Sequence, residues 1–274
     1  MAVLDGQDNP GRYTGLLHVA SQRPHGVGRM VYNDGNRIHE GFWSYGHRQG
    51  HGRCLFVQIG DYHEGNYQQN LRHGPGKYLW KDGRQFVGNY SNDERQGVGT
   101  FSYPNGDVYE GNFDKGQRHG TGNFVFKKRT CRYTGEWDRG VYGGQGKLQW
   151  KTTPKADVVH IYQGEFDKGL FHGQGTEFTI NVSDGNQTIV KQGMFDNGKF
   201  LGALPSNGDE SVAKETKGDN PEEQSVEEEE AEEAVDPDSD LVEAVSDLRI
   251  GEDETQNGID AEECATGKEA NKQQ

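Results

Sequence analysis

Large apolar side chains alternate with polar ones in short stretches along most of this chain. Two examples, Gly99–Tyr103 and Val108–Phe113, flank the dipeptide Asn105-Gly106. A period of two residues is that of a β-strand with one buried face. Asn-Gly and Asp-Gly favour tight hairpin turns because these residues accept positive φ angles. The pattern therefore predicts β-hairpins, with further turns of this kind at Asp34-Gly35, Asp82-Gly83 and Asp184-Gly185.

The predicted hairpins repeat one another. Residues 109–122 and 162–175 share Tyr, Gly, Phe, Asp-Lys-Gly and His-Gly-x-Gly at identical offsets. The structural positions of three units are Tyr109, Gly111, Phe113, Gly120, Gly122, Tyr133, Gly135, Trp137, Tyr162, Gly164, Phe166, Gly173 and Gly175. The first glycine of the unit recurs at Gly15, Gly41, Gly65, Gly88, Gly111, Gly135, Gly164 and Gly193. The sequence therefore predicts seven repeats and a partial eighth that ends near Gly202.

The alternation also explains the glycines. Tyr109, Gly111 and Phe113 fall on one face of their strand, and Gly99 and Phe101 do the same on the neighbouring strand. An aromatic ring can lie flat over a neighbouring glycine, where a β-carbon would block it. One hairpin cannot bury its own aromatic face, so stacked hairpins must share it. We therefore predict an all-β fold, an elongated, twisted and mainly antiparallel sheet.

Composition separates this array from the end of the chain. Hydrophobic residues make up only 30%, yet there are 12 Tyr, 12 Phe and 4 Trp against 41 Gly, so the folded part must be built around rings and glycine. Residues 1–204 carry 24 Lys and Arg against 20 Asp and Glu, whereas residues 205–274 carry 5 against 24, a net charge of −19. We divide the chain into an N-terminal segment 1–12, a repeat array 13–204 and an acidic low-complexity tail 205–274. We expect the tail to be disordered because it cannot bury enough apolar surface to offset chain entropy.

One part of the tail has a different pattern. In residues 240–248, Leu241, Val245 and Leu248 fall on one helical face, with Asp240 as a helix cap. One interpretation is a fluctuating helix in a solvated tail. The other is a docking motif that folds on a partner.

The candidate chemistry is sparse. His25, His73, His119 and His172 each precede a Gly-x-Gly pair, but they stand a full repeat apart and cannot converge on a metal ion. The Gly-x-Gly pairs lead into no predicted helix, and no Gly-Lys-Ser/Thr motif follows them, which argues against phosphate binding. No nucleophile–base set and no buried acid pair can be argued. We expect neither catalysis nor a metal or cofactor site.

Two further observations bear on location and partners. There are three cysteines without metal or disulfide spacing, no secretory pattern at Met1 and no apolar run of about 18 residues, so we expect a cytoplasmic protein. Lys127, Lys128 and Arg129 form the densest basic cluster. It is either a contact for anionic lipid or an acidic protein, or simply an exposed basic turn. The charge balance argues against nucleic acid.

The repeat pattern resembles that of the MORN family (membrane occupation and recognition nexus), whose motif is close to Tyr-x-Gly-x-Trp-x-x-Gly-x-x-His-Gly-x-Gly. The resemblance covers about residues 13–202. Departures are Asn70 and Asp93 in place of the turn glycine, an insertion at residues 152–157 and Phe178, which breaks the aromatic phase of the seventh repeat.

The layout of the whole chain is similar to that of the meichroacidin family of radial spoke head proteins, in which MORN repeats precede a Glu-rich tail. The segments that carry this likeness are 99–111, 133–137 and 191–195. The resemblance implies a non-catalytic subunit of the radial spoke head in the axoneme of motile cilia and flagella, part of the cytoskeleton. Its implied partners are other spoke-head proteins, with a homodimer or another two-fold assembly. The alternative is a peripheral membrane adaptor whose repeats bind anionic lipid or membrane proteins. A regulatory fragment of an enzyme is the weakest hypothesis, because no second folded domain is predicted.

Overall fold

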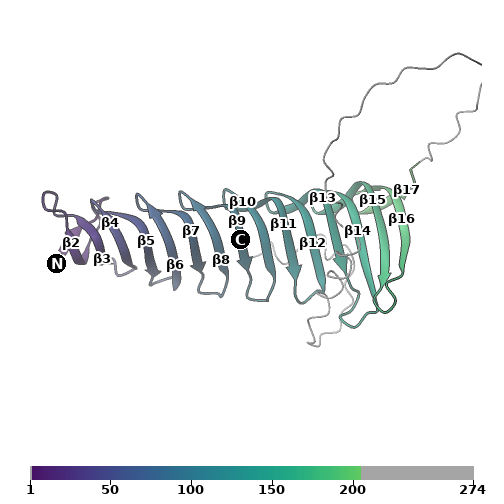
Figure 1. Ribbon diagram of the computed structural model, residues 1–274, viewed down its shortest axis with the longest axis horizontal. Helices are drawn as coiled ribbons and strands as arrows, with labels where there is room; N and C mark the ends of the chain where they lie inside the picture. The colour runs from purple at the N-terminus through teal and green to yellow at the C-terminus, as the bar shows by residue number, and fades with distance from the viewer. Residues whose placement is uncertain (1, 205–274) are drawn as a thin grey trace, which may run out of the picture.

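Residues 2–204 are described by the computed structural model, and they form one antiparallel sheet of 17 strands without any α-helix. Each strand pairs with its neighbours in sequence, so the sheet is a continuous meander along one axis (Figure 1). The predicted all-β, elongated antiparallel fold is confirmed. The strands are β1 (Ala2–Leu4), β2 (Pro10–Leu17), β3 (Pro24–Tyr32), β4 (Arg37–Ser44), β5 (His47–Phe56), β6 (Asp61–Gln68), β7 (Leu71–Leu79), β8 (Gln85–Ser91), β9 (Glu94–Ser102), β10 (Val108–Asp114), β11 (Gln117–Phe126), β12 (Cys131–Asp138), β13 (Val141–Trp150), β14 (Val158–Asp167), β15 (Leu170–Asn181), β16 (Gln187–Asp196) and β17 (Lys199–Gly202).

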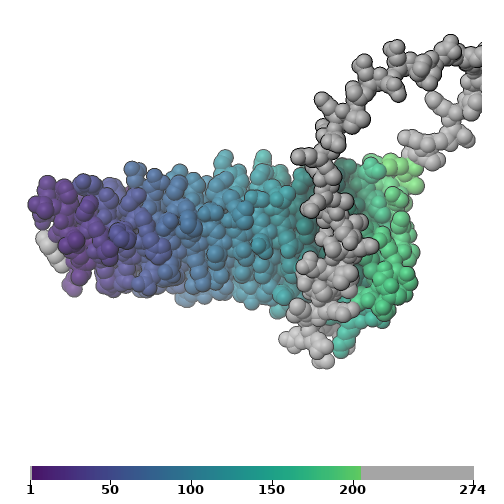
Figure 2. All heavy atoms as spheres, viewed as in Figure 1, coloured from purple at the N-terminus to yellow at the C-terminus, as the bar shows by residue number. Residues whose placement is uncertain are grey.

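The array is a narrow body that runs from the N-terminal strands at one end to β17 at the other (Figure 2). The segment 1–12 contributes β1 and the start of β2 to the same sheet. The predicted disorder of residues 205–274, and the helical face of Leu241, Val245 and Leu248, lie outside the described residues.

Two kinds of turn alternate along the edges of the sheet. In the Asp-Lys-Gly turns both central residues have positive φ, for example Lys115 (48°) and Gly116 (81°). These are the angles of a two-residue type I′ turn, which matches the twist of the flanking strands. Asn70 and Asp93 take the glycine position at φ 74° and 71°, and Asn and Asp tolerate this conformation better than other side chains.

The Asn-Gly and Asp-Gly turns differ from the expectation, which gave positive φ to both residues. Only the glycine is left-handed, as at Gly106 (φ 90°). The Gly106 amide donates to the Tyr103 carbonyl (3.0 Å), and the Tyr103 amide donates to the Asp107 carbonyl (2.9 Å). These bonds define a three-residue loop, in which a type I turn is followed by a left-handed glycine.

The sheet bends along a line of paired glycines. Gly111 lies opposite Gly122, but the next pair is Phe113 with Arg118, so β11 has two more residues than β10 in this interval. Gly120 lies in this bulge at φ 66°. Such a bulge bends the strand that contains it. We call the line of opposed glycines the crease; its members are Gly15/Gly28, Gly41/Gly52, Gly65/Gly76, Gly88/Gly99, Gly111/Gly122, Gly135/Gly146 and Gly164/Gly175.

The bend lets one face of a single sheet bury its own rings. Tyr109 and Phe113 are four residues apart, about 13 Å along a straight strand. Their ring centroids nevertheless lie 5.1 Å apart, with planes at 89°. Both side chains are buried, at 0% and 4% exposure. We call this face, which carries Tyr109 and its equivalents, the ring face, and the opposite one the outer face.

The rings form one ladder through the repeats. From the second repeat onward, each ring before the crease meets, edge to face, the ring after the crease in its own repeat and the one in the next repeat. Tyr109 thus contacts Phe113 and Trp137, and Tyr133 contacts Trp137 and Phe166. Such pairs contribute about 0.5–1.5 kcal/mol each beyond the area they bury. The hairpins are therefore coupled to their neighbours by the same contacts that make the core.

The seventh repeat changes phase, as Phe178 suggested. Tyr162 stays on the ring face, while Phe178 pairs with Ile161 on the outer face. There it forms a second buried cluster with Val159, Ile161 and Ile180. The break in the aromatic row therefore marks a second apolar surface at the C-terminal end of the array.

Candidate functional site

The repeat positions named from the sequence meet at the crease. The Tyr109 ring lies over Gly122, where an added β-carbon would fall 2.6 Å from two ring carbons. The Tyr109 hydroxyl donates to the Asn112 carbonyl (2.8 Å). Tyr133 and Tyr162 repeat this arrangement over Gly146 and Gly175. These residues form a structural set at the crease.

Two members of this ring series are histidines, and the repeat pattern did not predict them. His39 and His63 occupy the place of Tyr109 in the second and third repeats and are fully buried. Burial lowers the pKa of His39 to about 2 and that of His63 to about 3. His63 shares a 2.6 Å hydrogen bond with the Tyr67 hydroxyl through Nδ1. Both histidines are therefore neutral parts of the core.

A row of arginines covers the rings, also unforeseen. Arg48, Arg72, Arg95 and Arg118 each follow a type I′ turn and lie opposite the ring after the crease. The Arg118 guanidinium carbon lies 4.6 Å from the Trp137 ring centroid, and Nη2 donates to the Gly140 carbonyl (2.7 Å). Each guanidinium thus joins one hairpin to the turn of the next. The recurrence of Arg at steps of 24, 23 and 23 residues was the available sequence signal.

The arginines of this row differ in whether an acidic side chain lies beside them. Arg72 pairs with the Asp93 carboxylate at 2.8 Å, because Asp93 replaces the turn glycine of its repeat. Arg95 and Arg118 face Gly116 and Gly140 instead, and their guanidinium groups donate to the carbonyl oxygens of these glycines. Burial lowers the pKa of Arg95. This stretch of the ring face is therefore locally cationic.

A groove of about 490 Å³ opens at this cationic stretch. It is lined by Trp80, Arg84, Arg95, Phe101, Tyr103, Phe113, Lys115, Gly116, Gln117 and Arg118. None of these residues is acidic, although Arg84 pairs with Asp82 beside the groove (2.8 Å). Aromatic walls with guanidinium and ammonium groups suit a ligand that presents both carboxylates and apolar groups.

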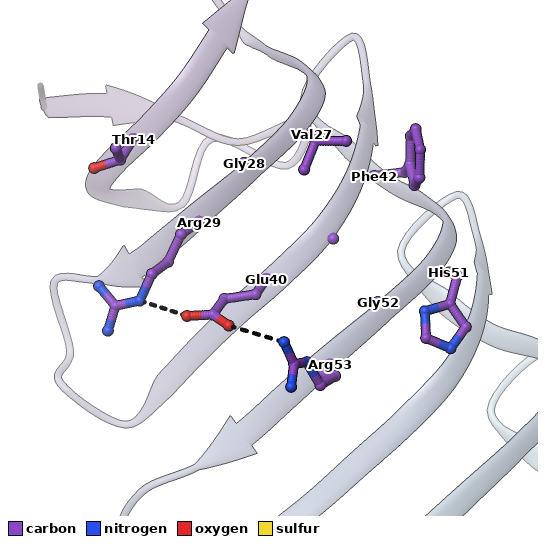
Figure 3. Close-up of a pocket in the computed structure, with 10 residues that line it drawn as sticks. Thr14, Val27, Gly28, Arg29, Glu40, Phe42, His51, Gly52 and Arg53 are labelled. Atoms are coloured by element: carbon purple, nitrogen blue, oxygen red, sulfur yellow. Dashed lines mark hydrogen bonds and ion pairs between the residues drawn. The ribbon is translucent and has the colours of Figure 1, made fainter.

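A second hollow of about 530 Å³ lies on the outer face of the first repeats (Figure 3). Arg29 and Arg53 flank Glu40, at 2.8 and 3.8 Å. Val27 and Phe42 stand beside this row and are 61% and 53% exposed. Exposed apolar groups next to a satisfied ion-pair row form a surface suited to protein contact.

The remaining sequence candidates do not converge. Lys127 and Lys128 are exposed in the turn after β11, while the Arg129 guanidinium lies over Phe126 at 5.9 Å. His119 and His172 are half exposed and pair with separate aspartates. Among residues 2–204 no group of three His, Cys, Asp or Glu side chains is placed to hold a metal ion. The described part of the chain also has no helix long and apolar enough to cross a membrane.

The family to which the repeats belong agrees with this architecture. The sequence profile of the MORN repeat matches residues 23–37, 39–58, 63–83, 86–108, 109–130, 133–152 and 162–179. No curated protein matches the chain. A solved structure of the SAS-4 (dCPAP) TCP domain of Drosophila melanogaster, in complex with a proline-rich motif of Ana2 (dSTIL), is similar at 14% identity with a TM-score of 0.37. That match covers 66% of this chain and 90% of the other. The matched repeats span half of the sequence and coincide with the hairpins of the sheet, and the chain therefore belongs to the MORN-repeat family.

Proposed function

We propose that this chain is a structural subunit of the radial spoke head in the axoneme of motile cilia and flagella. MORN repeats suggest a role in protein interaction or membrane binding, and all-β arrays of this kind are typically not enzymes. The observation that carries the proposal is the continuous ring ladder, which joins the repeats into one body with a groove on the ring face and a hollow on the outer face. Such a body suits holding other proteins in register.

The cationic groove is the proposed contact for a neighbouring spoke-head protein. Its carboxylate-seeking arginines and aromatic walls fit an extended acidic segment that also carries apolar side chains. A spoke head with two-fold symmetry would hold two copies of this chain, and each copy would offer one groove.

The test uses ciliated cells in which a tagged copy replaces the endogenous protein. We expect the tagged chain to stay with salt-washed axonemes and to co-purify with spoke-head subunits. Lys115→Glu reverses a charge in the groove without touching a buried ring, so it should weaken this co-purification severalfold. Lys168→Glu makes the same change in an equivalent turn outside the groove and should behave as wild type. A diffuse signal would contradict the proposal.

The exposed Lys127 and Lys128 support one other candidate function, that of a membrane adaptor. In that case the tagged chain would be lost from axonemes on detergent treatment. Lys127→Gln/Lys128→Gln would then reduce pelleting with vesicles that contain phosphatidylserine, while Lys115→Glu would leave co-purification unchanged.

A further inference from the structure

A row of exposed apolar side chains crosses the outer face of β2, β3 and β4, beside the crease. Leu16, Val27 and Phe42 are 71%, 61% and 53% exposed. Val27 lies directly opposite Phe42 in the sheet (Figure 3). The Leu16 side chain lies next to Val27, since a β-carbon added at Gly26 would meet its Cδ1 at 3.6 Å. The three side chains therefore form one continuous apolar surface, which we call the apolar row.

The fold does not require apolar residues at these positions, because the same positions recur in every repeat. At the place of Leu16 and Phe42, directly after the first crease glycine, the third to seventh repeats carry Asn66, Asn89, Asn112, Glu136 and Glu165. A polar residue here bonds to the bulged strand. The Glu136 carboxylate, for example, accepts a hydrogen bond from the Gln145 amide (3.1 Å). Leu16 and Phe42 cannot make such a bond, so binding explains their presence better than stability does.

The apolar row forms one wall of the outer-face hollow of about 530 Å³. The other wall is the ion-pair row on the far side of the crease, where Arg29 and Arg53 share the carboxylate of Glu40 (Figure 3). Apart from His51, the charged side chains of the lining are these two guanidinium groups and this one carboxylate. A net positive charge therefore lies alongside the apolar row.

The geometry of the surface favours a helical partner. Strands β3, β4 and β5 are paired on both sides, so this face offers no unpaired backbone groups to an extended strand. A helix has already satisfied its own backbone groups. Its side chains at i and i+4 lie about 5–6 Å apart, close to the spacing of about 4.8 Å between neighbouring strands. Anchors at i, i+4 and i+7 would therefore meet the three members of the apolar row in turn.

We propose that this surface binds an amphipathic helix of a partner protein, with aliphatic side chains on one face and carboxylates on the adjacent flank. The aliphatic face covers the apolar row, and the carboxylates lie toward Arg29 and Arg53. Laying a helix into an apolar groove is a common mode of recognition, and complementary charge at its side fixes the orientation. The site lies on the opposite face from the cationic groove, so it does not depend on the spoke-head assignment.

Binding of a synthetic helix to the full chain tests the proposal. The probe is a fluorescent peptide of about four helical turns, with leucines at the anchor spacing and glutamates on one flank. Fluorescence anisotropy should show that it binds. Val27→Thr/Phe42→Asn should weaken this binding at least about tenfold. The fold should be kept, because the array already carries Thr121 and Asn112 at the same two positions.

Val98→Thr is the matched control. Val98 holds the position of Val27 in the fourth repeat and is 60% exposed, but it lies opposite Asn112 and belongs to no apolar row. This variant should bind the probe as wild type does. Absence of binding to wild type would overturn the proposal, as would equal binding by wild type and Val27→Thr/Phe42→Asn.

A change in the probe tests the charge of the partner without altering the protein. Replacing its glutamates by lysines should weaken binding severalfold, because the lysines would face Arg29 and Arg53. Equal affinity of the two peptides would overturn the assignment of an acidic partner.

Further measurements separate this site from other occupants. Lys115→Glu, in the groove of the ring face, should leave the affinity for the probe unchanged, and a large loss would place the helix in that groove instead. Sedimentation velocity would reveal a second copy as the occupant, if Val27→Thr/Phe42→Asn converted a dimer to a monomer. Loss of pelleting with phosphatidylserine vesicles in the same variant would reveal a lipid surface. Each of these three results would overturn the proposal.

Discussion

At the scale of single residues, the crease leaves no room for a methyl group. Gly122→Ala would place its β-carbon 2.6 Å from carbons of the buried Tyr109 ring, which cannot move without disturbing Phe113 and Trp137. We expect a loss of about 1–3 kcal/mol in the free energy of unfolding, as for other overpacked cores. Urea unfolding measures it. Gly143→Ala is the control, because its β-carbon meets only ordinary contacts, at 3.7 Å. Equal stability of the two variants would show that the ring does not fill the space over the crease.

The buried histidines predict a dependence of stability on pH. The folded pKa values of His39 and His63, about 2 and about 3, lie below the unfolded value near 6.5. The unfolded chain therefore binds more protons as pH falls below about 6.5, and stability falls by up to about 1.4 kcal/mol per pH unit for each histidine.

His39→Tyr restores the ring found in most repeats and should remove one histidine's share of this slope between pH 6.5 and pH 4.5. Urea midpoints at the two pH values measure the difference. His119→Tyr, at a half-exposed position, serves as control. If His39→Tyr and wild type lose equal stability on acidification, the folded protein must accept a proton at His39.

At the scale of the hairpin, aromatic residues replace the arginine in two of the repeats. In the sixth and seventh repeats its place is taken by Tyr142 and Phe171, which stack on Tyr133 and Tyr162 at 3.9 and 3.8 Å. Arg118→Tyr should therefore cost less than about 1 kcal/mol, whereas Arg118→Ala leaves a cavity over the rings and should cost about 2 kcal/mol or more. Equal losses in urea unfolding would mean that the bond to Gly140, not the stacking, is the main contribution.

The sequence predicts some features of the hairpin correctly and does not predict others. Strand alternation, the Lys115-Gly116 turn and the packing of rings over glycine follow from side-chain size and backbone freedom, so they can be read directly. The burial of Arg118 cannot be predicted from the sequence. The alternation pattern places a charged residue beside a turn in solvent, and it does not reveal that the aliphatic part of the side chain can lie on a ring. His39 was missed for a similar reason, since a polar residue standing in a tyrosine position looks like a surface group. The groove depends on how two rows of turns curve over one face, and no local pattern records that.

At the scale of the whole molecule, the array should respond to damage locally. The main contacts of each hairpin are with its neighbours in the sheet, so stability is close to a sum over repeats and their interfaces. In the Gly122→Ala variant, hydrogen exchange should accelerate in β9–β13 and remain unchanged in β2–β5. Mass spectrometry of peptides from the two regions measures this. Acceleration of equal size throughout would show that the array unfolds as a single cooperative unit.

The crease has a mechanical consequence. A flat strip one layer thick bends easily out of its plane, but a strip folded along its length resists bending, because one margin must stretch while the other is compressed. The opposed glycines fold this sheet in that sense from Gly15 to Gly175, and the stacked rings keep the fold from opening. The molecule should therefore transmit a force from its first hairpin to its last with little bending. Twisting about the long axis should remain the easier deformation.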